Sequence, residues 1–322
     1  MAALAKANSA DVLYDFSIMR VYTDGRVERL AGKDVVPAGL DAETGVQSKD
    51  VVISPELNIS ARLYLPKTAG TDGRKLPLLV YFHGGGFVIE SAFSPTYQKH
   101  LNLVAAEANA VIVSVNYRLA PEHPLPAAYD DSWLALKWLA SHSHGGGQEP
   151  WLNHYADFDR AFFGGDSAGG NIAHNMAMRV GLENPDADGI YLEGIYLNCP
   201  FFWGKDPIGN EGDNVYVSSL LENLWKFVNP GTTGLDDPLI NPAVDPDLAR
   251  VGCKRVLVYV GEKDPLRNRG WHYKEALRKK GWDGYVEVVE AKGEDHVFNL
   301  INPTSDNAMA MVKKLASFIN NV

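Results

Sequence analysis

The feature that most constrains this chain is a serine set between glycines where an apolar run meets a helical stretch. The segment Gly165-Asp166-Ser167-Ala168-Gly169 fits the pattern G-x-S-x-G, with the apolar run 161–163 before it and a predicted helix from Asn171 onward. In that context the serine sits on a strained turn between a strand and a helix, and glycine leaves room for the turn. We therefore expect the Ser167 hydroxyl to project above a sheet at the positive end of a helix. A chance match on a glycine-rich turn is the alternative.

The rest of the chain alternates short apolar runs with helical stretches. Strands are predicted at 51–53, 59–65, 78–82, 110–115, 160–163, 190–197, 255–260 and 285–290. Helices are predicted at 97–108, 133–140, 171–180, 270–280 and 308–320. Strands that are apolar throughout and alternate with helices form mostly parallel sheets that are buried on both faces. The sequence thus predicts an α/β fold, a mostly parallel sheet covered by helices on both faces, in a single domain over residues 1–322.

Two segments stand outside this alternation, the first 50 residues and residues 200–250. The second is rich in glycine, proline, aspartate and aromatic residues. Open α/β sheets bind their ligands at the carboxyl ends of the strands, and both segments could cover that edge.

Composition excludes several classes of protein. Hydrophobic residues make up 46% and charged residues 22% of the 322 residues, which excludes a disordered chain. A net charge of -10 repels phosphate backbones, so we expect no nucleic-acid partner, and no apolar run is long enough to predict a membrane span. The two cysteines, Cys199 and Cys253, form neither a disulfide framework nor a zinc cluster. We expect two core or neutral cysteines, a cytoplasmic protein, and no metal or cofactor.

A serine hydroxyl needs a base to take its proton, and after a serine of this kind the acid and then the histidine follow along the chain. Three histidines follow Ser167. His174 lies too far along the helix that begins at the turn, and His272 lies inside a predicted helix. His296 falls in a loop just after the strand predicted at 285–290, where a base can reach the serine. We therefore predict His296 as the base.

The acid that orients this histidine is predicted from the preceding strand. Asp264 follows the strand 255–260 through a short loop, and Glu262 and Asp295 compete with it. The side chain of Asp295 diverges from its neighbour His296 and cannot easily reach the imidazole. Glu262 shares a face with Asp264 in an extended segment, but Asp264 reaches further toward the serine. We favour Asp264, with a solvated loop carboxylate as the alternative.

A second glycine-rich motif predicts an oxyanion hole, a set of backbone N–H groups that binds the charge developing on a substrate carbonyl. His83-Gly84-Gly85-Gly86-Phe87 follows the strand 78–82. Such HGGG segments donate N–H groups together with the residue after the nucleophile, so the candidates are Gly84, Gly85 and Gly86 with Ala168. A tight turn and a phosphate cradle are the alternatives, but no phosphate-binding lysine motif or G-x-G-x-x-G is present.

These motifs resemble the plant carboxylesterases of the hormone-sensitive-lipase branch of the α/β-hydrolases. The resemblance runs from about residue 11 to the end of the chain and rests on the stretches YFHGGGFVIESAFSPTYQKHLN, VNYRLAPEHPLPAAYDDSWLALKWL, FFGGDSAGGNIAHNMA, VLVYVGEKDPLRNRGWHYKEAL and EDHVF. It implies an α/β-hydrolase fold, a cap formed by residues 1–50 and 200–235, and a supporting segment at 117–122.

The same branch includes proteins that are not esterases. Gibberellin receptors look similar but lack the catalytic histidine, whereas this chain has His296. Some 2-hydroxyisoflavanone dehydratases have threonine at the nucleophile position, where this chain has Ser167, and some alkaloid cyclases change the oxyanion glycines or the triad. Because all the esterase positions are filled, we expect a serine carboxylesterase that works through an acyl-enzyme. A lyase, cyclase or dehydratase is the alternative, and a small-molecule receptor is less favoured.

The expected substrate pocket is apolar. Its candidates follow the oxyanion motif, leave the strand that ends near Asn198, or flank His296: Phe87, Val88, Ile89, Phe201, Phe202, Trp203, Val297 and Phe298. Such a lining favours small apolar or aromatic esters as the substrate, and packing in the core is the alternative for each residue.

Overall fold

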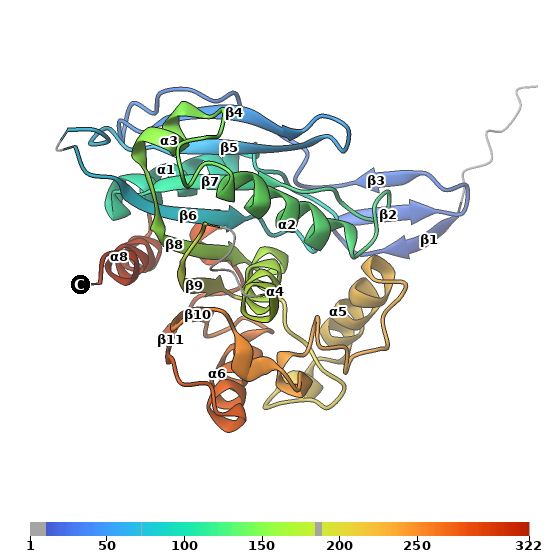
Figure 1. Cartoon of the computed structure of the whole chain (residues 1–322). Coiled ribbons are helices and arrows are strands. Elements are labelled where there is room, and N and C mark those ends of the chain that lie inside the picture. The colour runs from blue at the N-terminus through green and yellow to red at the C-terminus, as the bar shows by residue number, and fades with distance from the viewer. Residues whose placement is uncertain (1–10, 72, 184–188, 322) are drawn as a thin grey trace, which may run out of the picture.

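An eight-stranded sheet forms the centre of this computed structural model, which describes residues 11–71, 73–183 and 189–321 (Figure 1). The strand order is β11-β10-β9-β8-β6-β7-β5-β4. The strands are β4 (Gln47–Ser54), β5 (Ile59–Leu65), β6 (Leu76–Phe82), β7 (Val111–Asn116), β8 (Ala156–Asp166), β9 (Leu192–Asn198), β10 (Arg255–Gly261) and β11 (Tyr285–Ala291). Neighbours from β7 to β11 pair in parallel, and β4 and β5 are antiparallel. The predicted mostly parallel sheet is therefore confirmed.

Helices cover both faces of the sheet. One face carries α1 (Pro95–Ala108) and α8 (Asp306–Asn320), which pack on each other. The other face carries α2 (Ala127–Ala140), α4 (Ala168–Glu183) and α6 (Arg267–Lys280). Because every residue of β6 is buried between these layers, its sequence is apolar throughout.

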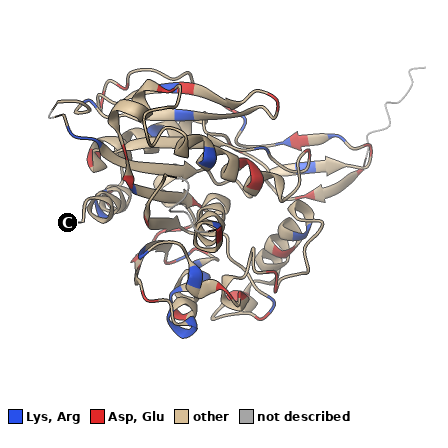
Figure 2. Cartoon of the chain, viewed as in Figure 1, with Lys and Arg blue, Asp and Glu red and all other residues tan. Residues whose placement is uncertain are grey.

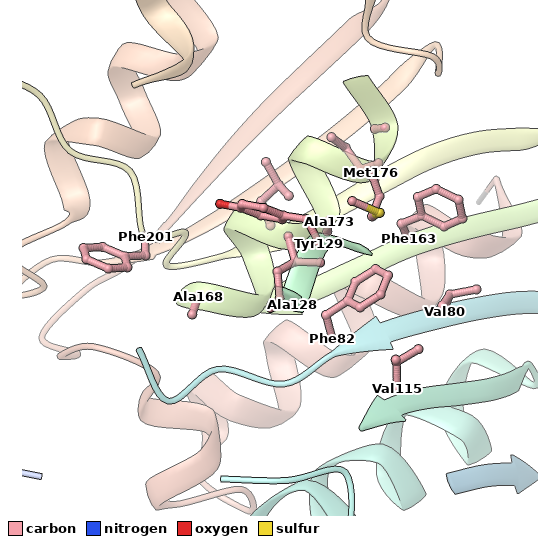
Figure 3. Close-up of a cluster of buried hydrophobic side chains, with 14 of the residues drawn as sticks. Val80, Phe82, Val115, Ala128, Tyr129, Phe163, Ala168, Ala173, Met176 and Phe201 are labelled. Atoms are coloured by element: carbon pink, nitrogen blue, oxygen red, sulfur yellow. The ribbon is translucent and has the colours of Figure 1, made fainter. Parts of the chain in front are cut away.

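The core beneath the site joins β6 and β8 to α4. Figure 3 shows Phe82, Phe163 and Met176 between the sheet and this helix. The rings of Phe82 and Phe163 meet edge to face, with centroids 6.5 Å apart. Edge-to-face pairs stabilise a core beyond the apolar area that they bury. This packing holds the ends of β6 and β8, which carry the two glycine-rich motifs, side by side.

Two segments outside the main sheet lie together beyond the carboxyl ends of its strands. The small antiparallel sheet of β1 (Val12–Asp15), β2 (Met19–Tyr22) and β3 (Val27–Arg29) lies beside α5 (Val215–Val228) in Figure 1. The Phe227 ring lies 5.0 Å from the rings of Tyr14 and Phe16, so the N-terminal segment and α5 form one unit. Residues 1–10 of the expected cap lie outside the described residues.

The expected cap boundary needs one correction. Residues 47–50 were assigned to the segment outside the sheet, but they begin β4, an edge strand of the main sheet. Their sequence, QSKD, has no apolar run because an edge strand is exposed along one side. The predicted strands and helices of the main domain are otherwise present. The elements that were not predicted are short or lie outside the central alternation: β1–β3, α5, α3 (Pro150–Tyr155) and α7 (Phe298–Ile301).

Positions of basic and acidic residues, blue and red in Figure 2, are interspersed along the chain. Within the described ranges, no helix has the length and apolar character that a bilayer crossing requires. The described residues also form the short 3-10 helices η2 (Glu211–Asp213), η3 (Pro242–Val244) and η4 (Leu248–Arg250).

Candidate active site

Ser167 occupies the sharp turn between β8 and α4. Its φ of 50° lies in the left-handed region, and its N–H donates to the Asn198 carbonyl over 2.9 Å. A Cβ on Gly169 would lie 1.9 Å from the carbonyl oxygen of Phe82, so only glycine lets the helix start this close to β6. The close approach of helix and strands positions the Ser167 hydroxyl above the sheet, as the motif predicts.

The structure brings Ser167, His296 and Asp264 together in one chain of hydrogen bonds. His296 lies in the loop after β11, with Nε2 3.0 Å from Oγ of Ser167. Its Nδ1 lies 3.0 Å from Oδ2 of Asp264, in the loop after β10. The serine is thereby joined to a base and the base to an acid. The three residues follow β8, β11 and β10, which are neighbours or near neighbours in the sheet.

The competing residues are engaged elsewhere. The Glu262 carboxylate accepts the Gly293 N–H over 2.7 Å, and Asp295 accepts the N–H of His296 itself over 2.7 Å. His174 is buried against the Tyr273 hydroxyl at 3.0 Å, and His272 stays on α6. Glu262, Asp295 and His174 are therefore each bonded to a group other than the serine, and His272 lies on another element.

The charges at the site stabilise a protonated imidazole beside an ionised carboxylate. Burial opposes a charged imidazole, but the neighbouring carboxylates, Asp264 above all, outweigh it and raise the pKa of His296. Burial likewise opposes a charged Asp264, but His296, the Cys199 thiol and the Leu266 N–H outweigh it and lower its pKa. Asp264 is therefore an anion that holds the imidazole by charge and by a hydrogen bond.

Cys199 lies next to this pair, although the sequence predicted only a core or neutral cysteine. It is buried, and its sulfur lies within 4.8 Å of ligand atoms of Asp264 and His296. Among the described residues this is the one group with the residue types and spacing of a metal site. Both imidazole nitrogens of His296 are already engaged, Nδ1 by Asp264 and Nε2 by Ser167, so the arrangement fits the hydrogen-bonded pair better.

The predicted oxyanion loop joins β6 to the segment before α1. Its residues Gly85, Gly86 and Phe87 have φ values of 93°, 61° and 65°, a run of left-handed backbone that glycine favours. Gly84, one of the predicted donors, does not point its N–H into the site, because it donates to the Tyr97 hydroxyl over 2.7 Å. In the described part of the chain, no partner is found for the N–H groups of Gly85 and Gly86, or for that of Ala168 at the start of α4.

A cavity of about 870 Å³ opens over Ser167. Of the predicted pocket residues, Ile89, Phe201, Trp203 and Val297 line it. The prediction was wrong for four residues that pack in the core: Phe87 against Tyr129, Phe202 against His174, Phe298 against Tyr259, and the fully buried Val88. Neighbouring side chains leave the backbone in different directions, so a run of apolar residues divides between cavity and core.

The opposite wall of the cavity comes from the two segments expected to cover the strand ends, but none of its individual residues was predicted. It consists of Phe16 and Ile18 from the N-terminal segment and apolar residues of α5, namely Val217, Leu220, Leu221 and Leu224. The α5 residues recur at the spacing i, i+3, i+4, i+7 that marks one face of a helix. That spacing is the signal that could have found them.

A family model described as the alpha/beta hydrolase fold matches residues 79–300. The chain belongs to the α/β-hydrolase family. Its expected place among relatives of the plant carboxylesterases is confirmed. It is 49% identical to Probable carboxylesterase 2 of Arabidopsis thaliana, over 94% of each protein. It is also 47% identical to a 2-hydroxyisoflavanone dehydratase of Glycyrrhiza echinata, again over 94% of each.

Among solved structures, this α/β-hydrolase is similar to a hyperthermophilic esterase from the archaeon Pyrobaculum calidifontis. The TM-score is 0.70 at 27% identity, and the match covers 85% of this chain and 83% of the other.

Proposed function

We propose that this α/β-hydrolase is a serine carboxylesterase in which Ser167 is the nucleophile, His296 the base and Asp264 the acid that orients it. The observation that carries the proposal is the pair of 3.0 Å contacts from Oγ through the imidazole to the carboxylate, at the floor of the cavity. Relatives named carboxylesterase and a similar solved esterase support the same activity.

The reaction follows from these contacts. Oγ of Ser167 attacks the ester carbonyl while Nε2 of His296 takes its proton, and Asp264 stabilises the imidazolium. Charge on the carbonyl oxygen is bound by the N–H groups of Gly85, Gly86 and Ala168, each donor lowering the barrier by about 3–4 kcal/mol. His296 then protonates the leaving alcohol. A water molecule, activated by the same imidazole, releases the acid from the acyl-serine.

The walls of the cavity suggest the substrate class. Trp203, Phe201 and the apolar face of α5 favour apolar or aromatic ester groups. A volume of about 870 Å³ is ample for a drug-sized ligand, so both small esters and bulky aromatic ones fit.

We place the protein in the cytoplasm. Both cysteines are free and buried, which suits a reducing compartment. The full chain with a fluorescent protein at its C-terminus should fill the cytoplasm of a plant cell, and signal confined to plastids or mitochondria would refute this assignment.

The function is tested with p-nitrophenyl esters of increasing acyl length and with aryl acetates. The wild type should release acid and alcohol in equal amounts, and a fluorophosphonate should label one serine per chain. Ser167→Ala should lose both the labelling and the hydrolysis, about a millionfold for the latter. Hydrolysis by Ser167→Ala at the wild-type rate would refute the proposal.

A dehydratase is the second candidate, because a relative with 47% identity is named 2-hydroxyisoflavanone dehydratase. The same base can remove a proton from a β-hydroxy substrate that then loses its hydroxyl group as water. Mass analysis distinguishes the two reactions: hydrolysis adds water and yields an acid, whereas dehydration removes 18 mass units and yields none. A hydroxyisoflavanone-type substrate should therefore be assayed beside the esters.

A further inference from the structure

We propose that Tyr97 is a positioning residue that holds the oxyanion loop in place by linking Gly84 to the buried carboxylate of Asp166. The inference rests on the proposed esterase function, because the loop is argued to bind the oxyanion. Tyr97 lies on α1, far along the chain from Ser167, and is not one of the residues predicted for the site.

Two hydrogen bonds of the Tyr97 hydroxyl carry the proposal. Its oxygen lies 2.7 Å from the Gly84 nitrogen and 2.9 Å from Oδ2 of Asp166. A backbone N–H can only donate, which leaves the phenol its own proton to give to the carboxylate. The phenol therefore donates to Asp166 and accepts from Gly84, which fills both of its roles. The loop is fixed to the carboxylate through this one oxygen.

The carboxylate is itself firmly held. Asp166 is 1% exposed, and its other oxygen, Oδ1, accepts the Tyr81 hydroxyl over 2.8 Å. A Cβ on Gly84 would lie 2.3 Å from Oδ2, so the loop rests directly on this group. Because Asp166 directly precedes Ser167, the same residue ties the oxyanion loop to the nucleophile.

This link matters for the reaction because the proposed donors, Gly85 and Gly86, come directly after Gly84. Without the phenol oxygen, the Gly84 N–H would lose its partner and the loop its attachment to Asp166. Donors stabilise a transition state only when they are aimed in advance at the developing charge. A displacement of about 1 Å at such a site can cost about 100-fold in rate.

The test compares Tyr97→Phe with Tyr81→Phe. Both variants remove one hydrogen bond from Asp166, but only Tyr97→Phe also releases Gly84. We expect Tyr97→Phe to lower kcat on p-nitrophenyl butyrate about 10- to 100-fold with KM within about twofold. Tyr81→Phe should keep kcat within about threefold. Because acylation and deacylation both pass through an oxyanion, the loss should appear in both single-turnover steps.

Three results would overturn the inference: equal kcat values for the two variants, an unchanged kcat in Tyr97→Phe, or a change in KM alone, which would make the phenol a substrate contact. Rates are expressed per reactive serine, counted by fluorophosphonate labelling taken to completion, so partial unfolding lowers the site count and leaves kcat unaffected. Wild type and Ser167→Ala run alongside. If wild type and Ser167→Ala hydrolyse the ester at the same rate, the proposed esterase function fails. If those two differ but the two tyrosine variants have equal kcat values, only the present inference fails.

Discussion

Arg269 and Glu211 form a buried ion pair that attaches the loop after β9 to α6. The guanidinium nitrogens lie 2.7 and 2.6 Å from the two carboxylate oxygens, and the side chains are 4% and 1% exposed. Arg269 also donates to the Asp206 carbonyl over 2.9 Å and lies 5.2 Å from the Trp203 ring. One cation thus holds three parts of the segment that leads from the sheet to α5.

This pair predicts a large loss of stability when one partner is removed. Glu211→Ala leaves a buried guanidinium without its counter-ion, and we expect the free energy of unfolding to fall by about 3–5 kcal/mol. The double variant Glu211→Met/Arg269→Met should recover much of that loss, because no buried charge remains. Urea denaturation followed by circular dichroism measures both. Glu183→Gln, which breaks an exposed pair with Arg179, is the control and should leave the midpoint almost unchanged.

The raised pKa of His296 predicts the acid side of the pH profile. The base must be neutral to take the serine proton, so kcat/KM should fall as the pH drops through this pKa. Because the charge of Asp264 raises it, the fall should lie above pH 6.5, the ordinary histidine value. Initial rates on an ester with a pH-independent leaving group give the profile. A midpoint below 6.5 would contradict the charge pairing described for the site.

Replacing the acid should affect both the rate and that profile. Asp264→Asn keeps the size of the side chain but removes the charge and can bind the wrong imidazole tautomer, so kcat should fall about 1,000- to 10,000-fold. The pKa of His296 should fall as well, moving the acid limb to lower pH. Glu262→Gln, at the competing carboxylate, should stay within about tenfold of wild type. A greater loss in Glu262→Gln than in Asp264→Asn would reverse the assignment of the acid.

The central fold was predictable because inner strands such as β6 are buried on both faces and therefore apolar throughout. The candidate site was predictable where a local motif or a strand end specifies it: Ser167 by its glycines, and His296 and Asp264 by their loops after β11 and β10. These signals are short in sequence and need no knowledge of distant contacts.

The remaining features depend on contacts between distant segments. The bond from Gly84 to Tyr97 depends on how α1 packs against the loop, so the motif alone counted Gly84 among the oxyanion donors. Phe87 and Phe202 were placed in the pocket because apolar sequence does not distinguish a cavity wall from the core. The strands β1–β3 are short and partly exposed, so no apolar run marks them.

The wall formed by α5 predicts how the enzyme selects its substrates. Leu224 is buried and lines the cavity, and its Cδ2 lies 3.0 Å from the place where a Cβ on Gly86 would be. Leu224→Ala should therefore open space beside the oxyanion loop. The ratio of kcat/KM for a hexanoate ester to that for an acetate ester should rise about tenfold. Leu248→Ala is the matched control, because Leu248 is equally apolar but packs in the core away from the cavity. Leu248→Ala should lower the free energy of unfolding by about 2–5 kcal/mol and leave the ratio of kcat/KM values as in the wild type. Equal ratios in the two variants would show that α5 does not determine which acyl chains the enzyme accepts.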